Sequence, residues 1–297
     1  MEICKATTTP NSMWSFCPSI APSILFIFLF ALTLITHIGQ AIYYRKPYSW
    51  VIIMSALWQT LTYIFRTLSI KNPGSYGDYA AWFVLILVAP LWTNAYVYTV
   101  FGRMVWNYTP THRLWRIKAW QFGLIFIILD IVAFVVQVLG AVQATGSDIT
   151  DQQILNGLHI YMGGVGLQLV FILIFCIYAL RFFLEIRQGP NSKDALTLFY
   201  AQILALAMIV LRIIFRICEY SQGLNSQIPN HEAYQYCLDS VPMLIALVVY
   251  NVVHPGRIMR GHAGDMPSVW ELRKQKKQGK YLTTTPFLSQ PDSTVRV

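Results

Sequence analysis

Charged and amide side chains stand inside segments of this sequence that are otherwise apolar. Arg212, Arg216 and Glu219 are spaced i, i+4 and i+7, which places them on one face of a helix. Two arginines at the centre of a bilayer cost roughly 5–7 kcal/mol, and the thirteen Leu, Ile, Val or Phe residues between Leu196 and Ile217 return only about 6 kcal/mol. Both arginines must therefore face protein or water. The intramembrane polar residues in which we expect the chemistry to be concentrated are Arg66, Asp130, Gln137, Gln168, Arg212, Arg216, Glu219 and Asp239.

The ionised members of this set balance in charge. Three arginines, Arg66, Arg212 and Arg216, stand against three carboxylates, Asp130, Glu219 and Asp239. Ionisable groups inside a membrane mark a functional site by default, so we predict a paired polar network that lines a cavity in the outer half of the bundle. The alternative is that these pairs only fix helix packing. For Asp130, which is seven residues before Gln137 and near mid-membrane, a proton-coupling role is a further hypothesis.

The elements that must position these groups are transmembrane helices. The 297 residues are 56% hydrophobic and 12% charged, about half the charge of a soluble domain. Seven runs are long enough to cross an apolar layer of about 30 Å. They are residues 20–44, 50–70, 79–101, 119–143, 157–183, 196–217 and 234–253. Barrel strands would be shorter and would alternate in polarity, so we predict an all-α integral membrane protein, a seven-transmembrane-helix bundle.

Loop charges orient this bundle. Basic residues follow the first, third, fifth and seventh runs, and eight Lys or Arg residues lie after His254. The positive-inside rule then predicts an exoplasmic segment 1–19, a membrane domain 20–254 and a basic cytoplasmic tail 255–297 that we expect to be disordered. The first run is too long for the apolar region of a signal peptide and should remain as a helix. The net charge of +9 is thus a topology signal, and no nucleic-acid partner is expected.

Cysteines and glycines add two secondary expectations. Four cysteines lie on or near the exoplasmic side, where disulfides persist, and their three pairings cannot be separated by sequence; free thiols are the alternative. These are Cys4, Cys17, Cys218 and Cys237. Gly163, Gly164 and Gly166 precede Gln168 and permit close helix approach, which also leaves room for a ligand.

Motifs in a fixed order carry a family resemblance. They are Ala95-Tyr96 through Gly102-Arg103, the Asp130, Gln137 and Gly140 spacing, the glycines before Gln168, Arg212-x-x-x-Arg216-x-x-Glu219-x-x-x-Gly223, His231-Glu232, Asp239 with Pro242-Met243, and His254-Pro255-Gly256. In this pattern the sequence resembles the fungal lipid-translocating exporter family, the RTA-like proteins. It departs from the family where Gln59 and Thr62-Tyr63 precede Arg66, because an acidic residue and Gly-Tyr are expected there.

The resemblance implies a function. It implies stress- or drug-linked proteins associated with sphingoid-base efflux, resistance to amphiphilic sterols and, in one branch, porphyrin transport. The implied partners are membrane lipids or amphiphilic small molecules with charged head groups. Apart from the resemblance, cytoplasmic regulators of the tail are a further candidate class of partner. It adds His231 and Glu232 to the candidate cavity residues. The expected location is the plasma membrane, with the vacuolar or another endomembrane as the alternative.

Two other function classes remain as alternatives. A seven-helix sensor or receptor has the same topology and would signal through the basic loops and tail, although no lysine lies inside a predicted helix to hold retinal. An intramembrane metal hydrolase needs several His and carboxylate ligands, and only His159, His231, Glu232 and Asp239 come near this pattern. No G-x-x-x-x-G-K-[ST] loop occurs, so direct use of ATP is excluded. We therefore expect a transporter rather than an enzyme, without a cofactor or metal.

Overall fold

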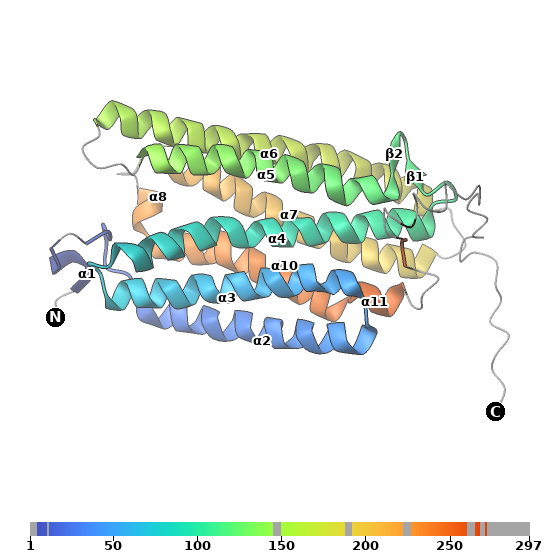
Figure 1. Ribbon diagram of the computed structural model, residues 1–297, viewed down its shortest axis with the longest axis horizontal. Coiled ribbons are helices and arrows are strands. Elements are labelled where there is room, and N and C mark those ends of the chain that lie inside the picture. Colours follow the sequence, from blue (N-terminus) through green and yellow to red (C-terminus); the bar gives the residue numbers. More distant parts are fainter. Residues whose placement is uncertain are drawn as a thin grey trace.

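The computed structural model describes residues 5–10, 12–144, 150–187, 192–221, 227–259, 265–267 and 271. Within these residues, seven helical segments are long and apolar enough to cross a membrane. The long helices lie side by side along one axis of an elongated bundle (Figure 1). The helices are α1 (Lys5–Thr8), α2 (Ile20–Tyr44), η1 (Pro47–Ser49), α3 (Trp50–Lys71), α4 (Tyr76–Tyr108), α5 (Ala119–Ala144), α6 (Asp151–Ile186), α7 (Ser192–Tyr220), α8 (Gln227–Asn230), α9 (Glu232–Gln235), η2 (Tyr236–Ser240), α10 (Val241–Val252) and α11 (Pro255–Ile258).

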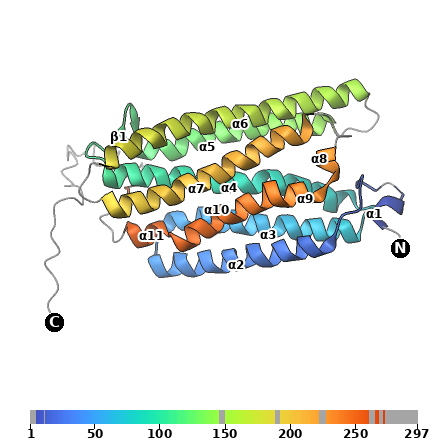
Figure 2. The same cartoon turned by 180° about the vertical axis from the view of Figure 1, so that it is seen from behind.

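Consecutive helices are neighbours in the bundle, and the last crossing fills the space between them. The chain runs from α2 to α3, α4, α5, α6 and α7 with each helix packed on the next. Helix α10 then packs on α7, α2 and α4. Helices α5 and α6 lie on one side of the bundle and α2 and α3 on the other, with α4, α7 and α10 between them (Figures 1 and 2). Side chains on α4, α7 and α10 can therefore meet in the interior.

The predicted spans agree with the structure to within four residues apart from two ends. The first helix has the predicted bounds, whereas α4 continues to Tyr108, past the predicted end at Phe101. This extension is stable because Met104, Val105 and Trp106 are buried against other helices. Asn107 therefore lies in the last helical turn, where its amide donates to the Arg103 carbonyl at 2.8 Å. Helix α6 likewise begins at Asp151, six residues before its predicted start.

A π-helical turn interrupts the seventh crossing. Pro242 lacks the N–H that an α-helix would use to bond the Leu238 carbonyl, and η2 precedes it with π geometry. The backbone N–H of Val241 reaches back to the Tyr236 carbonyl, five residues earlier. This wider turn holds the side chains of Asp239 and Ser240 inside the bundle.

The two ends of the bundle differ in charge. The basic end carries Lys46, the strands β1 (Arg113–Leu114) and β2 (Ile117–Lys118), which pair as an antiparallel hairpin, and α11. The other end, here called the N-terminal end, carries the segment before α2 together with α8 and α9 (Figures 1 and 2). The loops that the sequence predicts to be cytoplasmic thus gather at one end. Which end faces the cytoplasm stays a prediction from their charge.

Glycines allow α5 and α6 to touch along their length. A Cβ added to Gly140 would lie 2.3 Å from the Tyr161 nitrogen, and one added to Gly164 would lie 2.8 Å from Gln137. The close approach predicted from the glycine cluster is confirmed at Gly164. It is wrong for Gly163 and Gly166, where an added Cβ would meet nothing within 4 Å.

The cysteine expectation is partly settled. Cys17 is disulfide-bonded, whereas Cys176, Cys218 and Cys237 are free thiols. Cys4, Gly223 and most of the tail after Met259 lie outside the described residues.

Candidate functional site

Four charged side chains of α7 and η2 form a closed ionic cluster near the N-terminal end. Asp239 accepts a hydrogen bond from Arg212 Nε at 2.5 Å and a second, short one from a terminal nitrogen of Arg216. Arg216 also donates to Glu219 at 2.9 Å, and Arg212 donates to the Ile86 carbonyl of α4 at 2.9 Å. Each of these four charged residues is at most 6% exposed. We call Arg212, Arg216, Glu219 and Asp239 the ionic cluster.

The ionic cluster is electrically neutral, since two guanidinium groups face two carboxylates. A buried charge is tolerated only when it is paired and its remaining polar atoms are hydrogen-bonded. The predicted one-face spacing is confirmed: Arg212 and Arg216 both pair with Asp239 of the seventh crossing, and Glu219 pairs with Arg216 on the same face of α7. Tyr161 of α6, which the sequence did not single out, lies within electrostatic range of all four charges.

Arg66 lies apart from the ionic cluster. Its guanidinium donates to the Tyr236 hydroxyl and the Gln235 side chain, each at 2.9 Å, and contacts Glu232 at 3.4 Å. It also sits about 5 Å from three ring centroids, at 5.1 Å from Trp14, 4.9 Å from Trp82 and 5.1 Å from Tyr236. The arginine is therefore caged by aromatic rings and fully buried.

This aromatic cage joins the N-terminal segment to the bundle. The Trp14 indole donates to the Ser69 hydroxyl at 3.1 Å and stacks on Trp82. Glu232 accepts from the Ser19 backbone at the start of α2 at 3.0 Å, so the carboxylate bridges Arg66 and the helix N-terminus. The carboxylate that contacts Arg66 therefore comes from α9 and not from α3.

Asp130 differs from the sequence-based expectation. Its carboxylate accepts from Asn94 at 2.8 Å and Tyr98 at 3.1 Å, both on α4, and no arginine among the described residues pairs with it. The single network of three cations and three anions is therefore divided, with Asp130 in a neutral amide and hydroxyl environment. Asn94 and Tyr98 could have been suspected from the sequence only as polar side chains four residues apart on a buried helix.

The remaining candidates are dispersed. Gln137 donates to Gln168 at 3.1 Å across the α5–α6 contact, and neither residue takes part in the ionic cluster. His231 is exposed at the start of α9 and packs edge-on against Tyr234. Within the described part of the chain, no three or more His, Cys, Asp or Glu side chains are grouped so that they could hold a metal ion.

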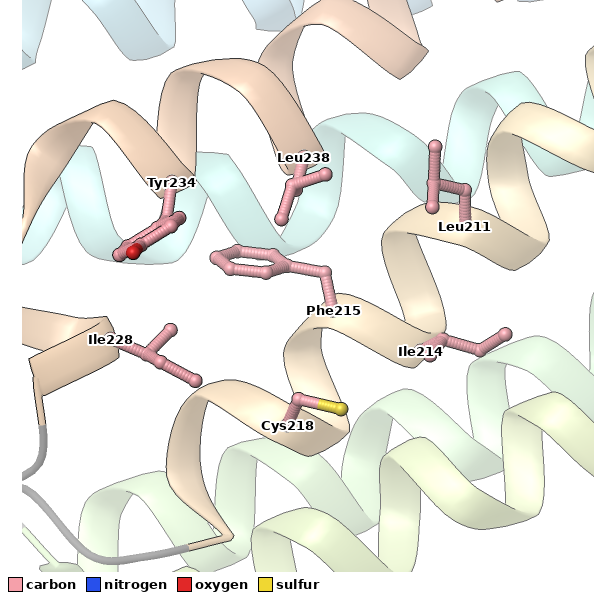
Figure 3. A pocket seen from close by; sticks show the side chains of 7 residues that line it. All are labelled: Leu211, Ile214, Phe215, Cys218, Ile228, Tyr234 and Leu238. Carbon is pink, nitrogen blue, oxygen red and sulfur yellow. The ribbon is translucent and has the colours of Figure 1, made fainter.

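An apolar pocket of about 300 Å³ lies beside the ionic cluster. Figure 3 shows Phe215 of α7 pointing between Tyr234 and Leu238 of the seventh crossing, with Ile228 of α8 opposite Cys218. The lining is Leu211, Ile214, Phe215, Cys218, Ile228, Tyr234 and Leu238.

The pocket and the ionic cluster occupy adjacent faces of the same two helices. Leu211 and Phe215 each precede an arginine of the cluster, and Leu238 precedes Asp239. Ile214 and Tyr234 are exposed on the outside of the bundle, so the pocket borders the membrane lipid while the charges lie inward. Such an arrangement suits a molecule with an apolar chain and a charged head.

The fold and the site thus define a seven-helix membrane protein in which a buried ionic cluster lies beside an apolar pocket that faces lipid. The chain belongs to the RTA1-like protein family, whose family model matches residues 52–262. It is 40% identical to the probable lipid transporter atnI of Emericella nidulans, over 87% of this chain and 70% of that protein.

Two relatives from Saccharomyces cerevisiae are more distant. Protoporphyrin uptake protein 1 is 30% identical over 65% of this chain and 64% of its own length. The sphingoid long-chain base transporter RSB1 is 23% identical over 89% of this chain and 78% of its own length. No solved structure matches the chain. The predicted family and its seven-helix membrane architecture are confirmed.

Proposed function

We propose that this protein translocates amphiphilic lipids, such as sphingoid bases, across its membrane. The observation that carries the proposal is the adjacency of a neutral, buried ionic cluster and an apolar pocket that faces lipid. The names of the relatives support the same class, because two are described as lipid or sphingoid-base transporters and one as a porphyrin uptake protein. They favour transport over the sensor hypothesis and over catalysis.

The ionic cluster supplies a place for a charged head group. An ammonium group that approaches Glu219 can pair with its carboxylate while Arg216 keeps Asp239 as its carboxylate partner, and the cluster then gains one positive charge. A phosphate or carboxylate head would use Arg212 and Arg216 in the same way. Exchange of partners keeps the cost of bringing a head group into the bundle low, and it is this exchange that we assign to the cluster.

The pocket supplies the place for the chain. Its lining is apolar apart from a thiol and a phenol, and Phe215 separates it from the charged face of α7. A lipid chain in the pocket would hold its head group near the level of the cluster without leaving the membrane. Of the other candidates, Arg66 with Glu232, Asp130 with its α4 partners, and Gln137 with Gln168 shape the bundle around this path. We assign His231 to its entrance at the N-terminal end, and we place the protein in the plasma membrane.

Liposomes test this proposal. Purified protein is reconstituted with a fluorescent sphingoid base, and movement between leaflets is followed by quenching from outside, with and without a pH gradient. We expect the wild type to accelerate movement and Glu219→Gln to slow it, because one carboxylate that can receive the head group is lost. Glu185→Gln is the matched control, since Glu185 forms an exposed pair with Arg181 at 3.9 Å on the surface of α6. Movement no faster than in protein-free liposomes would contradict the proposal.

A further inference from the structure

A second charged site lies at the basic end, far from the ionic cluster. Lys46 follows the α2 C-cap Arg45, whose left-handed backbone (φ 52°) turns the chain back under the bundle. The Lys46 side chain is only 6% exposed, although lysines at helix ends ordinarily extend into water. Its ammonium lies 2.6 Å from the carboxylate of Asp265, a residue of the C-terminal segment.

Arg103 of α4 adds a second cation. Its guanidinium lies 4.1 Å from the centroid of the Tyr48 ring, a cation–π contact. Asp265 and Tyr48 are both within electrostatic range of Arg103. Asp265 therefore faces two cations, Lys46 directly and Arg103 at longer range.

Buried hydrogen-bonding groups of η1 and α4, the elements that carry Tyr48 and Arg103, are left without partners among the described residues. The hydroxyls of Tyr48, Ser49 and Tyr96 and the Nε of Arg103 are buried, and none of them has a hydrogen-bond partner among the described residues. Tyr48 and Ser49 are at most 5% exposed. A buried polar group without a partner costs roughly 1–3 kcal/mol, so several together indicate a place built to receive a ligand with many acceptor oxygens.

The C-terminal segment is anchored so that Asp265 can reach this place. His254 accepts from the Gly256 backbone at 3.0 Å and stacks on Tyr44, which starts α11 against the end of α2. The buried Met259 contacts Asn107 of α4, and Met266 packs on the core next to Asp265. The carboxylate thus reaches the two cations from the protein's own chain.

We propose that Lys46, Arg103, Tyr48 and Ser49 form a binding site for the phosphate of an anionic phospholipid, and that Asp265 is a built-in competitor for it. The site lies where α2 and α3 leave the apolar layer, which is the level of lipid head groups. Basic pockets between helices on a cytoplasmic face commonly bind such heads. A phosphate offers more acceptor oxygens than a carboxylate, so it can meet the hydroxyls that Asp265 leaves unpartnered. Because this site is separate from the ionic cluster, its test does not depend on transport.

Binding of dihexanoyl phosphatidic acid to the full-length protein in a neutral detergent tests the proposal, with calorimetry as the readout. We expect Asp265→Asn to tighten binding at least roughly threefold, the effect of losing a partly exposed competing charge. Lys46→Gln should weaken it about tenfold or more, because a buried phosphate partner is lost. Asp194→Asn, which neutralises an exposed carboxylate in the first turn of α7, is the control and should leave binding unchanged.

One further variant and two further ligands test the site and the lipid assignment separately. Tyr48→Phe removes one hydroxyl and keeps the ring beneath Arg103, so it tests the site if Lys46→Gln fails to fold. Dihexanoyl phosphatidylcholine should bind more weakly than phosphatidic acid, and inorganic phosphate more weakly still. Equal binding of phosphatidylcholine, or inorganic phosphate as tight as phosphatidic acid, would overturn the lipid assignment. Unchanged affinity in both Asp265→Asn and Tyr48→Phe would overturn the site.

Discussion

Asp239 on the π-helical turn lies 2.5 Å from Arg212 on α7 and also accepts from Arg216. The last two crossings of the bundle are therefore joined by a carboxylate that is shared between two guanidinium groups. The π turn before Pro242 positions Asp239, so the pairing of the two buried arginines depends on this local backbone geometry.

Asp239→Asn should destabilise the protein strongly. The substitution leaves two buried arginines facing only Glu219, and breaking a buried pair typically costs about 3–5 kcal/mol. Thermal unfolding in detergent measures the loss. Glu185→Gln breaks an exposed pair on α6 and should cost less than about 1 kcal/mol. If the two variants unfolded at the same temperature, the ionic cluster would not contribute to stability.

The rings and neutral acceptors around Arg66 should contribute more to the stability of the protein than its ion pair with Glu232 does. Glu232 contacts the guanidinium at 3.4 Å and is partly exposed, whereas three rings surround Arg66 at about 5 Å and two neutral acceptors lie at 2.9 Å. Arg66→Lys keeps the charge but loses the planar fork, so we expect it to lower stability more than Glu232→Gln does. Unfolding curves of the two variants provide the measurement. A larger loss in Glu232→Gln would show that the ion pair dominates.

The extent of the helices could be predicted from sequence, because apolar run length follows from membrane thickness. The sequence could not predict which polar groups pair with one another. Asp130 and Arg66 were expected in one network, but the rotation of each helix about its axis decides the partner, and α4 turns Asn94 and Tyr98 toward Asp130. Trp14 lies before the first span with no periodicity, so nothing in the pattern places it against Arg66.

Gly140 and Gly163 provide a matched pair for the contact between α5 and α6. A methyl group at Gly140 would overlap the backbone of Tyr161, since the added Cβ would lie only 2.3 Å from its nitrogen. Gly140→Ala must therefore separate the helices and lower the unfolding temperature. Gly163→Ala meets nothing within 4 Å and should be neutral or stabilising by about 0.5–1 kcal/mol, the usual gain of Ala over Gly in a helix. Destabilisation of both variants to the same degree would argue against the close contact at Gly140.

Asp130→Asn separates a structural role of this carboxylate from proton coupling. Asp130 accepts from Asn94 and Tyr98 through one oxygen, and its other oxygen has no hydrogen-bond partner in the described part of the chain. An amide of the same shape can keep both accepted bonds through its oxygen, and it replaces a buried carboxyl group that pairs with no cation among the described residues, so the variant should be at least as stable as the wild type.

A transport measurement on Asp130→Asn tests whether this carboxylate couples transport to protons. In liposomes with a fluorescent sphingoid base, a coupling role predicts that Asp130→Asn abolishes the response to a pH gradient while movement without a gradient persists. A response equal to that of the wild type would assign Asp130 to the packing of α4 on α5. Gln137→Leu is the control, because it disrupts the hydrogen bond to Gln168 on another contact of α5 without touching a carboxylate. If this variant also lost the response to the gradient, distortion of α5 rather than loss of the proton-binding group would account for both results.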